Sequence, residues 1–165
     1  MVHSEEELRL ILDASAKAAQ ISRVSQEIVA NAFEIRRRLV REVMTPRGEV
    51  VYLDTSLSFR DNLQRAKTAR HTRFPLCIGH FDHAIGLIHI KDMLAHLDEP
   101  EPSLLAIKKD LVVVPEMLPL ERLLTRFRDQ RAHLALVVDE FGGNAGVVTL
   151  QHVIAEVIGD SFGCL

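Results

Sequence analysis

The seven residues Gly86-Leu-Ile-His-Ile-Lys-Asp92 recur later in the sequence as a similar heptad, Gly146-Val-Val-Thr-Leu-Gln-His152. Gly146 lies 60 positions after Gly86. The likeness extends beyond these heptads, because residues 50–97 and 111–158 keep the same order of apolar and polar residues once a one-residue gap is allowed in the intervening helix. Self-similarity at a fixed offset predicts two copies of one structural unit.

Each copy opens with a β-branched run, continues with apolar residues at helical spacing, and ends in two short strands and a closing helix. In the first copy we expect a strand over 50–53, a helix with Leu57, Phe59, Leu63 and Ala66 on one face, strands over 74–78 and 84–90, and a helix over 91–97. In the second we expect a strand over 111–114, a helix with Leu120, Leu123, Leu124 and Phe127 on one face, strands over 134–138 and 145–150, and a helix over 151–158. The order is β-α-β-β-α twice, an α/β (α+β) fold.

The linkers between paired strands are GHFDH (79–83) and DEFGGN (139–144), and their Gly, Asp and Asn residues are typical of hairpin turns. Such short links cannot carry a parallel crossover, so the paired strands are predicted to be antiparallel.

A helical segment precedes the repeats. Ser4 followed by Glu7 is a capping-box pattern, and a second helix is expected over Ser25–Ile35. The run Arg36–Arg38 has two interpretations. It is either the solvated end of that helix, where cations suit the helix dipole, or a contact for phosphate groups.

The composition excludes several classes of protein. Of 165 residues, 47% are apolar and 26% charged, as in ordinary folded domains. No apolar run reaches the length of a membrane span, and the start MVHSEEE does not resemble a signal peptide. With a net charge of −3 and no Trp, we expect no nucleic-acid partner. The two cysteines, Cys77 and Cys164, exclude a disulfide framework, and Cys77 is expected to be a buried, inert thiol.

Several phrases together resemble a known family. They are REVMTPR (41–47), TRFPL (72–76), GLIHIKDML (86–94), AHLALVVDEFGGNAGVVTL (132–150) and IAEVIGD (154–160). The chain resembles a pair of CBS domains, also called a Bateman module, from the CorC/hemolysin-like membrane proteins and their cyclin-M (CNNM) relatives. The resemblance implies two CBS repeats, 41–100 and 101–160, related by a pseudo-twofold axis. A helical linker over 1–40 precedes them, and a tail over 161–165 follows.

The resemblance also implies a function. It is a cytosolic regulatory module that senses AMP or ATP, with Mg²⁺ arriving only through ATP, for a magnesium and cobalt transport or efflux protein. The implied partners are a second copy, forming a homodimer, and the transmembrane domain of a parent protein. The implied location is the cytoplasmic face of the inner or plasma membrane. The chain is then expected to be either an excised module or an unusual stand-alone one. The alternative function is a ligand-free dimerisation module.

The family pattern assigns nucleotide-contacting residues by position. Thr45 and Thr149 match nucleotide-contacting threonines, and Thr72, Arg73, Phe74 and Pro75 match the wall that holds the base. Ile85 and Val147 are expected to line the same cleft. His152 stands where the family has a ribose-binding Asp. A neutral imidazole offers one acceptor, so it cannot hold both ribose hydroxyls as a carboxylate does. The site is expected either to bind nucleotide weakly or to be empty.

The first repeat differs, because it keeps Asp92 and has His89 at the threonine position. Asp92 either caps the helix that follows or belongs to a second nucleotide site. That alternative site comprises His89, Asp92, His133 and Leu134.

No metal site and no enzymatic activity are expected. His80, Asp82 and His83 fall in one predicted hairpin linker without a second cluster. Ser161-Phe-Gly is not a nucleophile elbow, and no Gly-rich phosphate loop precedes a Lys.

Overall fold

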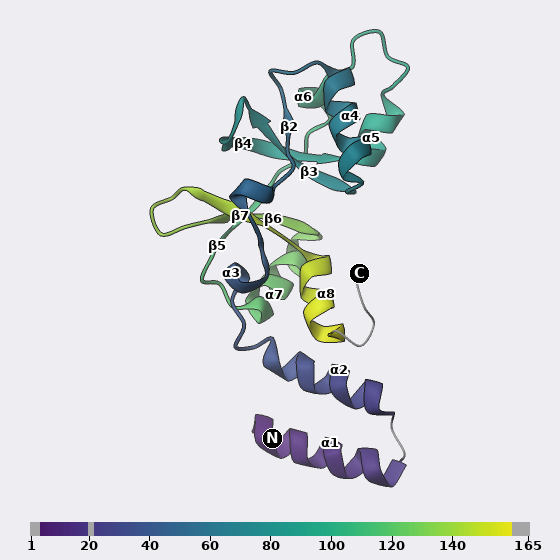
Figure 1. Cartoon of the computed structure of the whole chain (residues 1–165), viewed down its shortest axis with the longest axis vertical. Helices are drawn as coiled ribbons and strands as arrows, with labels where there is room; N and C mark the ends of the chain where they lie inside the picture. Colours follow the sequence, from purple (N-terminus) through teal and green to yellow (C-terminus); the bar gives the residue numbers. More distant parts are fainter. Residues whose placement is uncertain (1–3, 20–21, 160–165) are drawn as a thin grey trace. The chain divides into compact units, whose positions relative to one another are not determined.

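The computed structural model describes residues 4–19 and 22–159, so Ser161 and Cys164 of the predicted tail lie outside the described residues. The chain divides into two units (Figure 1). We call residues 44–116 with 134–148 the sheet unit, and the described part of residues 1–43, 117–133 and 149–165 the helical unit.

The first repeat forms a three-stranded sheet in the sheet unit. Its strands are β2 (Leu53–Asp54), β3 (Arg73–Ile78) and β4 (His80–His89), in that order. β2 runs parallel to β3, and β3 runs antiparallel to β4. Its helices are α4 (Phe59–Ala69), α5 (Ile90–Ala95) and α6 (Leu104–Ile107) (Figure 1). Strands and helices share one core cluster, comprising Leu53, Ala66, Phe74, Leu76, Ile88, Met93, Leu104 and Ile107.

The second sheet has four strands in the order β1-β7-β6-β5. They are β1 (Thr45–Pro46), β5 (Val112–Pro115), β6 (Leu134–Val138) and β7 (Asn144–Thr149). A 3-10 turn, η1 (Arg47–Glu49), follows β1. β5 runs parallel to β6, as β2 does to β3, and this common arrangement confirms the repeat.

Each sheet is completed by the segment that precedes the other repeat. Thr45, ahead of the first repeat, pairs with Val147 in the second sheet. Lys109, ahead of the second repeat, pairs with Leu87 in the first sheet, through N···O distances of 2.9 and 2.8 Å. The sequence did not predict this exchange, because a two-residue strand and a single bridge leave no periodic signal.

The exchange explains the glycine that opens each heptad. A Cβ at Gly146 would lie 2.1 Å from the Thr45 carbonyl oxygen. A Cβ at Gly86 would lie 2.9 Å from the Lys109 carbonyl oxygen. The crossing backbone therefore requires a residue without a side chain at both positions.

A second apolar cluster joins the two repeats inside the sheet unit. It comprises Cys77, Phe81, Leu134, Leu136 and Val147. Asn144 adds a polar link, because its Nδ2 donates to the Phe81 carbonyl oxygen over 2.7 Å.

The helical unit contains α1 (Glu5–Ala19), α2 (Arg23–Glu34), α3 (Val40–Val43), α7 (Leu120–Gln130) and α8 (Leu150–Ile158). The predicted capping box is confirmed, since the Glu7 amide donates to Ser4 Oγ and the Ser4 amide to Glu7 Oε2. α2 contacts α8, and Asn31 Nδ2 donates to the Val157 carbonyl oxygen over 3.0 Å.

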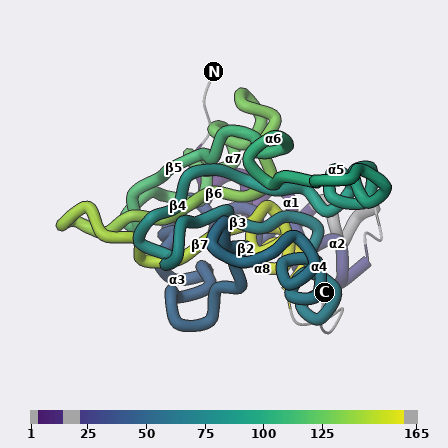
Figure 2. The backbone as a smooth tube through the Cα atoms, turned by 90° about the horizontal axis from the view of Figure 1, so that it is seen from above, coloured from purple at the N-terminus to yellow at the C-terminus, as the bar shows by residue number. Residues whose placement is uncertain are grey.

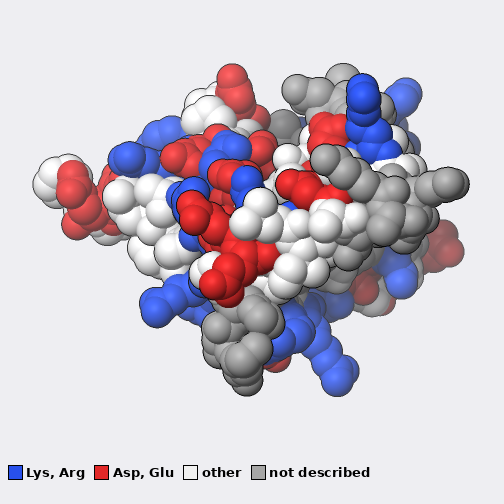
Figure 3. Space-filling view, turned by 90° about the horizontal axis from the view of Figure 1, so that it is seen from below, with Lys and Arg blue, Asp and Glu red and all other residues white. Residues whose placement is uncertain are grey.

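The run Arg36–Arg38 lies just after α2 and faces carboxylates. Arg36 pairs with Glu121, and Arg38 pairs with both Glu42 and Glu156. Basic and acidic side chains also lie side by side on much of the face drawn in Figure 3. These pairs favour the helix-end interpretation of the run over a phosphate contact.

The prediction that residues 79–83 form a hairpin linker was wrong. β4 already begins at His80, so only Gly79, at φ 75°, makes the turn. The register between β3 and β4 shifts on both sides of Cys77, and these shifts let the longer β4 pair with the shorter β3. The first strand is shorter than predicted, because Val50 and Tyr52 instead pack against the second apolar cluster.

The second predicted linker is a tight turn. Asp139 Oδ1 accepts from the amides of Phe141 (2.9 Å) and Gly143 (2.8 Å), and Gly142 has φ 81°. The β6–β7 hairpin extends away from the rest of its sheet in Figures 1 and 2.

Cys77 is fully buried, and burial with the nearby Asp54 charge raises the pKa of its thiol to about 12. Since the thiolate is the reactive form, we expect Cys77 to resist Ellman's reagent at pH 8 in the folded protein and to react rapidly in denaturant. The measurement uses a Cys164→Ser variant, so that only one thiol reports. Rapid labelling without denaturant would contradict the burial.

Candidate functional site

Thr45 and Val147 are positioned by the pairing of β1 with β7. Thr45 lies opposite Val147. Thr149 ends β7 two residues later, so Val147 and Thr149 point to the same side of the strand. Val147 is 7% exposed and belongs to the second apolar cluster.

Thr149 and His152 form a reciprocal cap at the start of α8. The His152 amide donates to Thr149 Oγ1 over 3.2 Å, and the Thr149 amide donates to His152 Nδ1 over 3.1 Å. A ring nitrogen that accepts from an amide carries no proton, so the proton of the neutral ring lies on Nε2. The sequence pattern missed this cap, because His is not the usual partner in a capping box.

The predicted base wall lies at the start of β3. Phe74 and Pro75 are buried, and Ile85 on β4 is half-buried. The Thr72 carbonyl oxygen already accepts from the Ile90 amide over 2.8 Å. Phe74 belongs to the core of the first repeat, so the wall is anchored by packing.

In the first repeat, His89 rather than Asp92 caps the following helix. The Lys91 amide donates to His89 Nδ1 over 3.0 Å. Asp92 lies in the first turn of α5, and its Oδ2 is 3.5 Å from Lys109 Nζ. The capping interpretation of Asp92 was therefore wrong, because its carboxylate faces a cation outside the helix.

The other two residues of the alternative second site lie at the start of β6. The His133 carbonyl oxygen accepts from the Leu150 amide over 2.9 Å. Leu134, the first residue of β6, is 4% exposed and belongs to the second apolar cluster.

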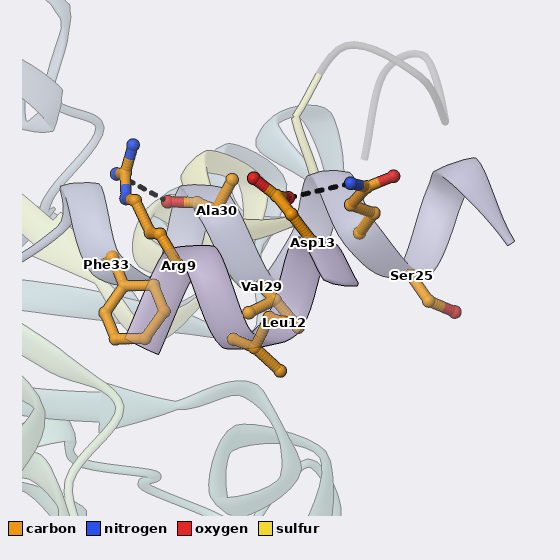
Figure 4. A pocket seen from close by; sticks show the side chains of 8 residues that line it. Arg9, Leu12, Asp13, Ser25, Val29, Ala30 and Phe33 are labelled. Atoms are coloured by element: carbon orange, nitrogen blue, oxygen red, sulfur yellow. Dashed lines mark hydrogen bonds between the residues drawn. The ribbon is translucent and has the colours of Figure 1, made fainter. Parts of the chain in front are cut away.

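Two hollows are lined by none of the predicted site residues. One, of about 150 Å³, lies between α1 and α2 (Figure 4). Leu12, Val29 and Phe33 form its apolar part, while Arg9 Nη2 donates to the Ala30 carbonyl oxygen over 3.5 Å. The other is lined by Thr55, Leu57, Phe59, Asn62 and residues 102–105.

Metal-ligating side chains do not gather in the part of the chain that the structure describes. Within residues 4–19 and 22–159, no group of three His, Cys, Asp or Glu side chains could hold an ion. Asp82 instead pairs with Arg47 at 2.9 Å and lies 3.2 Å from His80 Nδ1. Across the same ranges, no helix is both long and apolar enough to cross a bilayer.

Comparison with known proteins gives a consistent result. A family model described as CBS domain matches residues 40–99 and 105–159. UPF0053 protein YugS of Bacillus subtilis is 36% identical over 97% of this chain. Magnesium and cobalt efflux protein CorC of Pasteurella multocida is 32% identical over 95% of it. The chain spans only 38% of the first relative and 53% of the second.

Solved structures give the same family. The CBS domain of a bacterial CNNM/CorC family Mg²⁺ transporter is 35% identical, with a TM-score of 0.87, over 96% of this chain and 98% of that one. The same kind of domain in complex with ATP has a TM-score of 0.77 at 35% identity, over 82% and 97%. A CBS-domain pair with bound AMP from Klebsiella pneumoniae has a TM-score of 0.65 at 26% identity, over 73% and 98%.

Proposed function

The chain is a CBS-domain pair of the CNNM/CorC family, and we propose that it binds an adenine nucleotide and regulates a divalent-cation transporter. The observation that carries the proposal is the relative with ATP, which is 35% identical to this chain and shares its fold. The module would act at the cytoplasmic face of a membrane, coupled to the transmembrane domain of a magnesium or cobalt transport protein. Mg²⁺ would arrive only as the ATP complex.

The residues proposed to hold the nucleotide are those that the family pattern assigns: Thr45, Thr72, Arg73, Phe74, Pro75, Ile85, Val147, Thr149 and His152. Three observations support them. The Thr72–Pro75 wall is anchored in a core, Val147 and Thr149 share one side of β7, and Thr45 is fixed by pairing with Val147. The weak point is the ribose contact, because His152 Nδ1 is already used by the cap.

We expect His152→Asp to tighten AMP binding by about tenfold, because a carboxylate adds charge-assisted bonds to the ribose hydroxyls. The gain should be smaller for metal-free ATP, since the new charge repels its phosphates. Stability should change little, because an Asp at this position can still accept from the Thr149 amide. Calorimetric titration with AMP, ATP and ATP with Mg²⁺ measures these affinities.

Thr149→Ser and Thr149→Val form the matched control pair. Thr149→Ser keeps the hydroxyl and should bind nucleotide as the unmodified chain does. Thr149→Val should weaken nucleotide binding both in the unmodified chain and in the His152→Asp variant. Thermal unfolding without ligand separates this effect from loss of the α8 cap. Unchanged affinity in both His152→Asp and Thr149→Val would place the nucleotide elsewhere.

A ligand-free dimerisation module is the second candidate. Two observations favour it. His152 stands where the family has a ribose-binding Asp, and apolar side chains on and after α5 are exposed to solvent, with Leu94 52% and Leu105 54% exposed. We propose a homodimer in both interpretations, since apolar helix faces of this kind are stabilised by a second copy. Light scattering at high micromolar concentration should give twice the chain mass, and a monomer would count against it.

A further inference from the structure

Helix α1 carries apolar side chains on two faces, and α2 packs against one of them (Figure 1). Leu12 lines the hollow between the two helices, and Leu8, one turn earlier on the same face, is half-buried. Because successive residues of a helix are turned by about 100°, Leu10 and Ala14 point away from Leu12, and Ile11 borders them. Leu10 is 69% and Ile11 50% exposed, and Ala14 is also exposed. We call these three residues the outer face of α1, and apolar residues on both sides of a helix are typical of one that is covered on both sides.

The outer face has bulky residues towards the start of α1 and small residues towards its end. Leu10 and Ile11 come about one turn before Ala14, and the sequence continues with Ala18 one turn later. If two copies of this face pack antiparallel, the bulky half of each helix lies over the small half of the other. Parallel packing would place leucine beside leucine and leave a gap between the alanines, which close-packed interfaces avoid. The sizes of these residues therefore fit a second copy of α1 in the antiparallel direction.

The charges along α1 fit the same direction. Glu5, Glu6 and Glu7 occupy the first turn of the helix. Lys17 follows 11 positions after Glu6, which is about three turns, so both positions lie on the same face. Antiparallel pairing brings the acidic turn of one α1 close to position 17 of the other, and it also opposes the two helix dipoles. In a parallel pair, the two acidic turns would face each other and repel.

We propose that the outer face of α1 is an interface with α1 of a second copy of this chain, packed antiparallel about a twofold axis. Leu10 of each copy then lies against Ala14 of the other, and each contact occurs twice. The interface goes beyond the proposed function, because it needs no nucleotide. It also uses other residues than the apolar side chains on and after α5, so the two surfaces can be tested separately.

Disulfide coupling between two single-cysteine chains tests the contact and its direction. Leu10→Cys and Ala14→Cys chains, each also carrying Cys164→Ser, are mixed and oxidised, while Cys77 is protected by burial. The mixed 10–14 disulfide should dominate, because a disulfide needs Cα atoms within about 7 Å. Two identical positions would be four residues, or about 6 Å, out of register along the helix axes. Asp13→Cys is the matched control for Ala14→Cys, since position 13 is also exposed but lines the α1–α2 hollow.

Sedimentation equilibrium measures the strength of the contact. Leu10→Asp should weaken self-association by about tenfold or more, because the twofold axis removes its apolar contact twice. Val24→Asp is the matched control, since it places the same charge at an exposed apolar position on α2, and it should change the association constant by less than about twofold. Both variants also carry Leu94→Asp, so that association through α5 does not contribute. Circular dichroism confirms that the variants remain folded.

A charge exchange tests the antiparallel direction independently. Glu6→Lys should weaken self-association, and the addition of Lys17→Glu should restore it, because the exchange recreates opposite charges across the interface. Preferred coupling between two Leu10→Cys chains, or equal coupling at positions 13 and 14, would overturn the proposal. So would a monomer at high micromolar concentration in the Leu94→Asp chain. Preferred 10–14 coupling in a chain that binds no nucleotide would keep the interface and remove only the proposed nucleotide function.

Discussion

Gly146→Ala should destabilise the fold by about 3 kcal/mol or more, because overpacking against backbone cannot be relieved by a rotamer change. The new Cβ would lie 2.1 Å from the Thr45 carbonyl oxygen and 3.3 Å from Pro46 Cα. The β1–β7 pairing would have to separate, which would also displace Thr45. Urea unfolding followed by circular dichroism measures the change in free energy.

Two other glycines serve as controls for this prediction. Gly86→Ala should cost less, since its Cβ would lie 2.9 Å from the Lys109 carbonyl oxygen and its next neighbours are atoms of the flexible Lys108 side chain. Gly48→Ala should be nearly neutral, because no atom lies within 4 Å of the new Cβ. Equal stability of all three variants would contradict the close crossing of the two segments.

Asp54→Ala should also be strongly destabilising, by about 3 kcal/mol, because it leaves buried N–H and O–H donors without an acceptor. Asp54 is 6% exposed, and its Oδ1 accepts from the Ser56 amide (2.9 Å), Ser56 Oγ (2.7 Å) and the Gly79 amide (2.8 Å). These bonds tie β2 to the β3–β4 turn. The hydrogen bonds between the Asn62 side chain and the backbone of residue 54 do not use the carboxylate, so they should remain in the variant.

Asp54 should also make stability depend on pH. Burial alone would raise its pKa, but the hydrogen bonds from Ser56 and Gly79 and the charge of Arg65 outweigh burial, so the pKa is lowered from 3.8. The contribution of this carboxylate is therefore complete above its unfolded pKa and is lost as the pH falls through the folded value. Urea midpoints between pH 6 and pH 3 should fall less steeply for Asp54→Asn than for the unmodified chain. If the urea midpoints of both proteins fell equally with pH, another group would control stability in acid.

The repeat order was predictable because it rests on periodicity. The strand over 134–138 and the helix over 151–158 match β6 and α8 closely, because the first is a short uninterrupted apolar run and the apolar residues of the second recur at helical spacing. Both depend on local chain geometry, which the sequence displays directly.

The rest could not be predicted, because it depends on contacts between distant segments. Thr45 pairs with Val147, and Leu87 pairs with Lys109. The one sequence feature that reflects these pairings is the glycine at the start of each heptad. Likewise, the use of His152 Nδ1 by the Thr149 amide becomes evident only when the cap is formed. The family pattern marked His152 as unusual, and only the structure shows that its Nδ1 accepts from the backbone of Thr149.

We propose above that this CBS pair binds an adenine nucleotide. Calorimetric titration of the unmodified chain with AMP and with ATP, with and without Mg²⁺, tests it most directly. We expect saturable heat with one nucleotide per chain and a matching rise in the unfolding temperature, both reduced by Thr149→Val. No heat and no thermal shift up to millimolar nucleotide would contradict it and would leave the dimerisation module as the function of this chain.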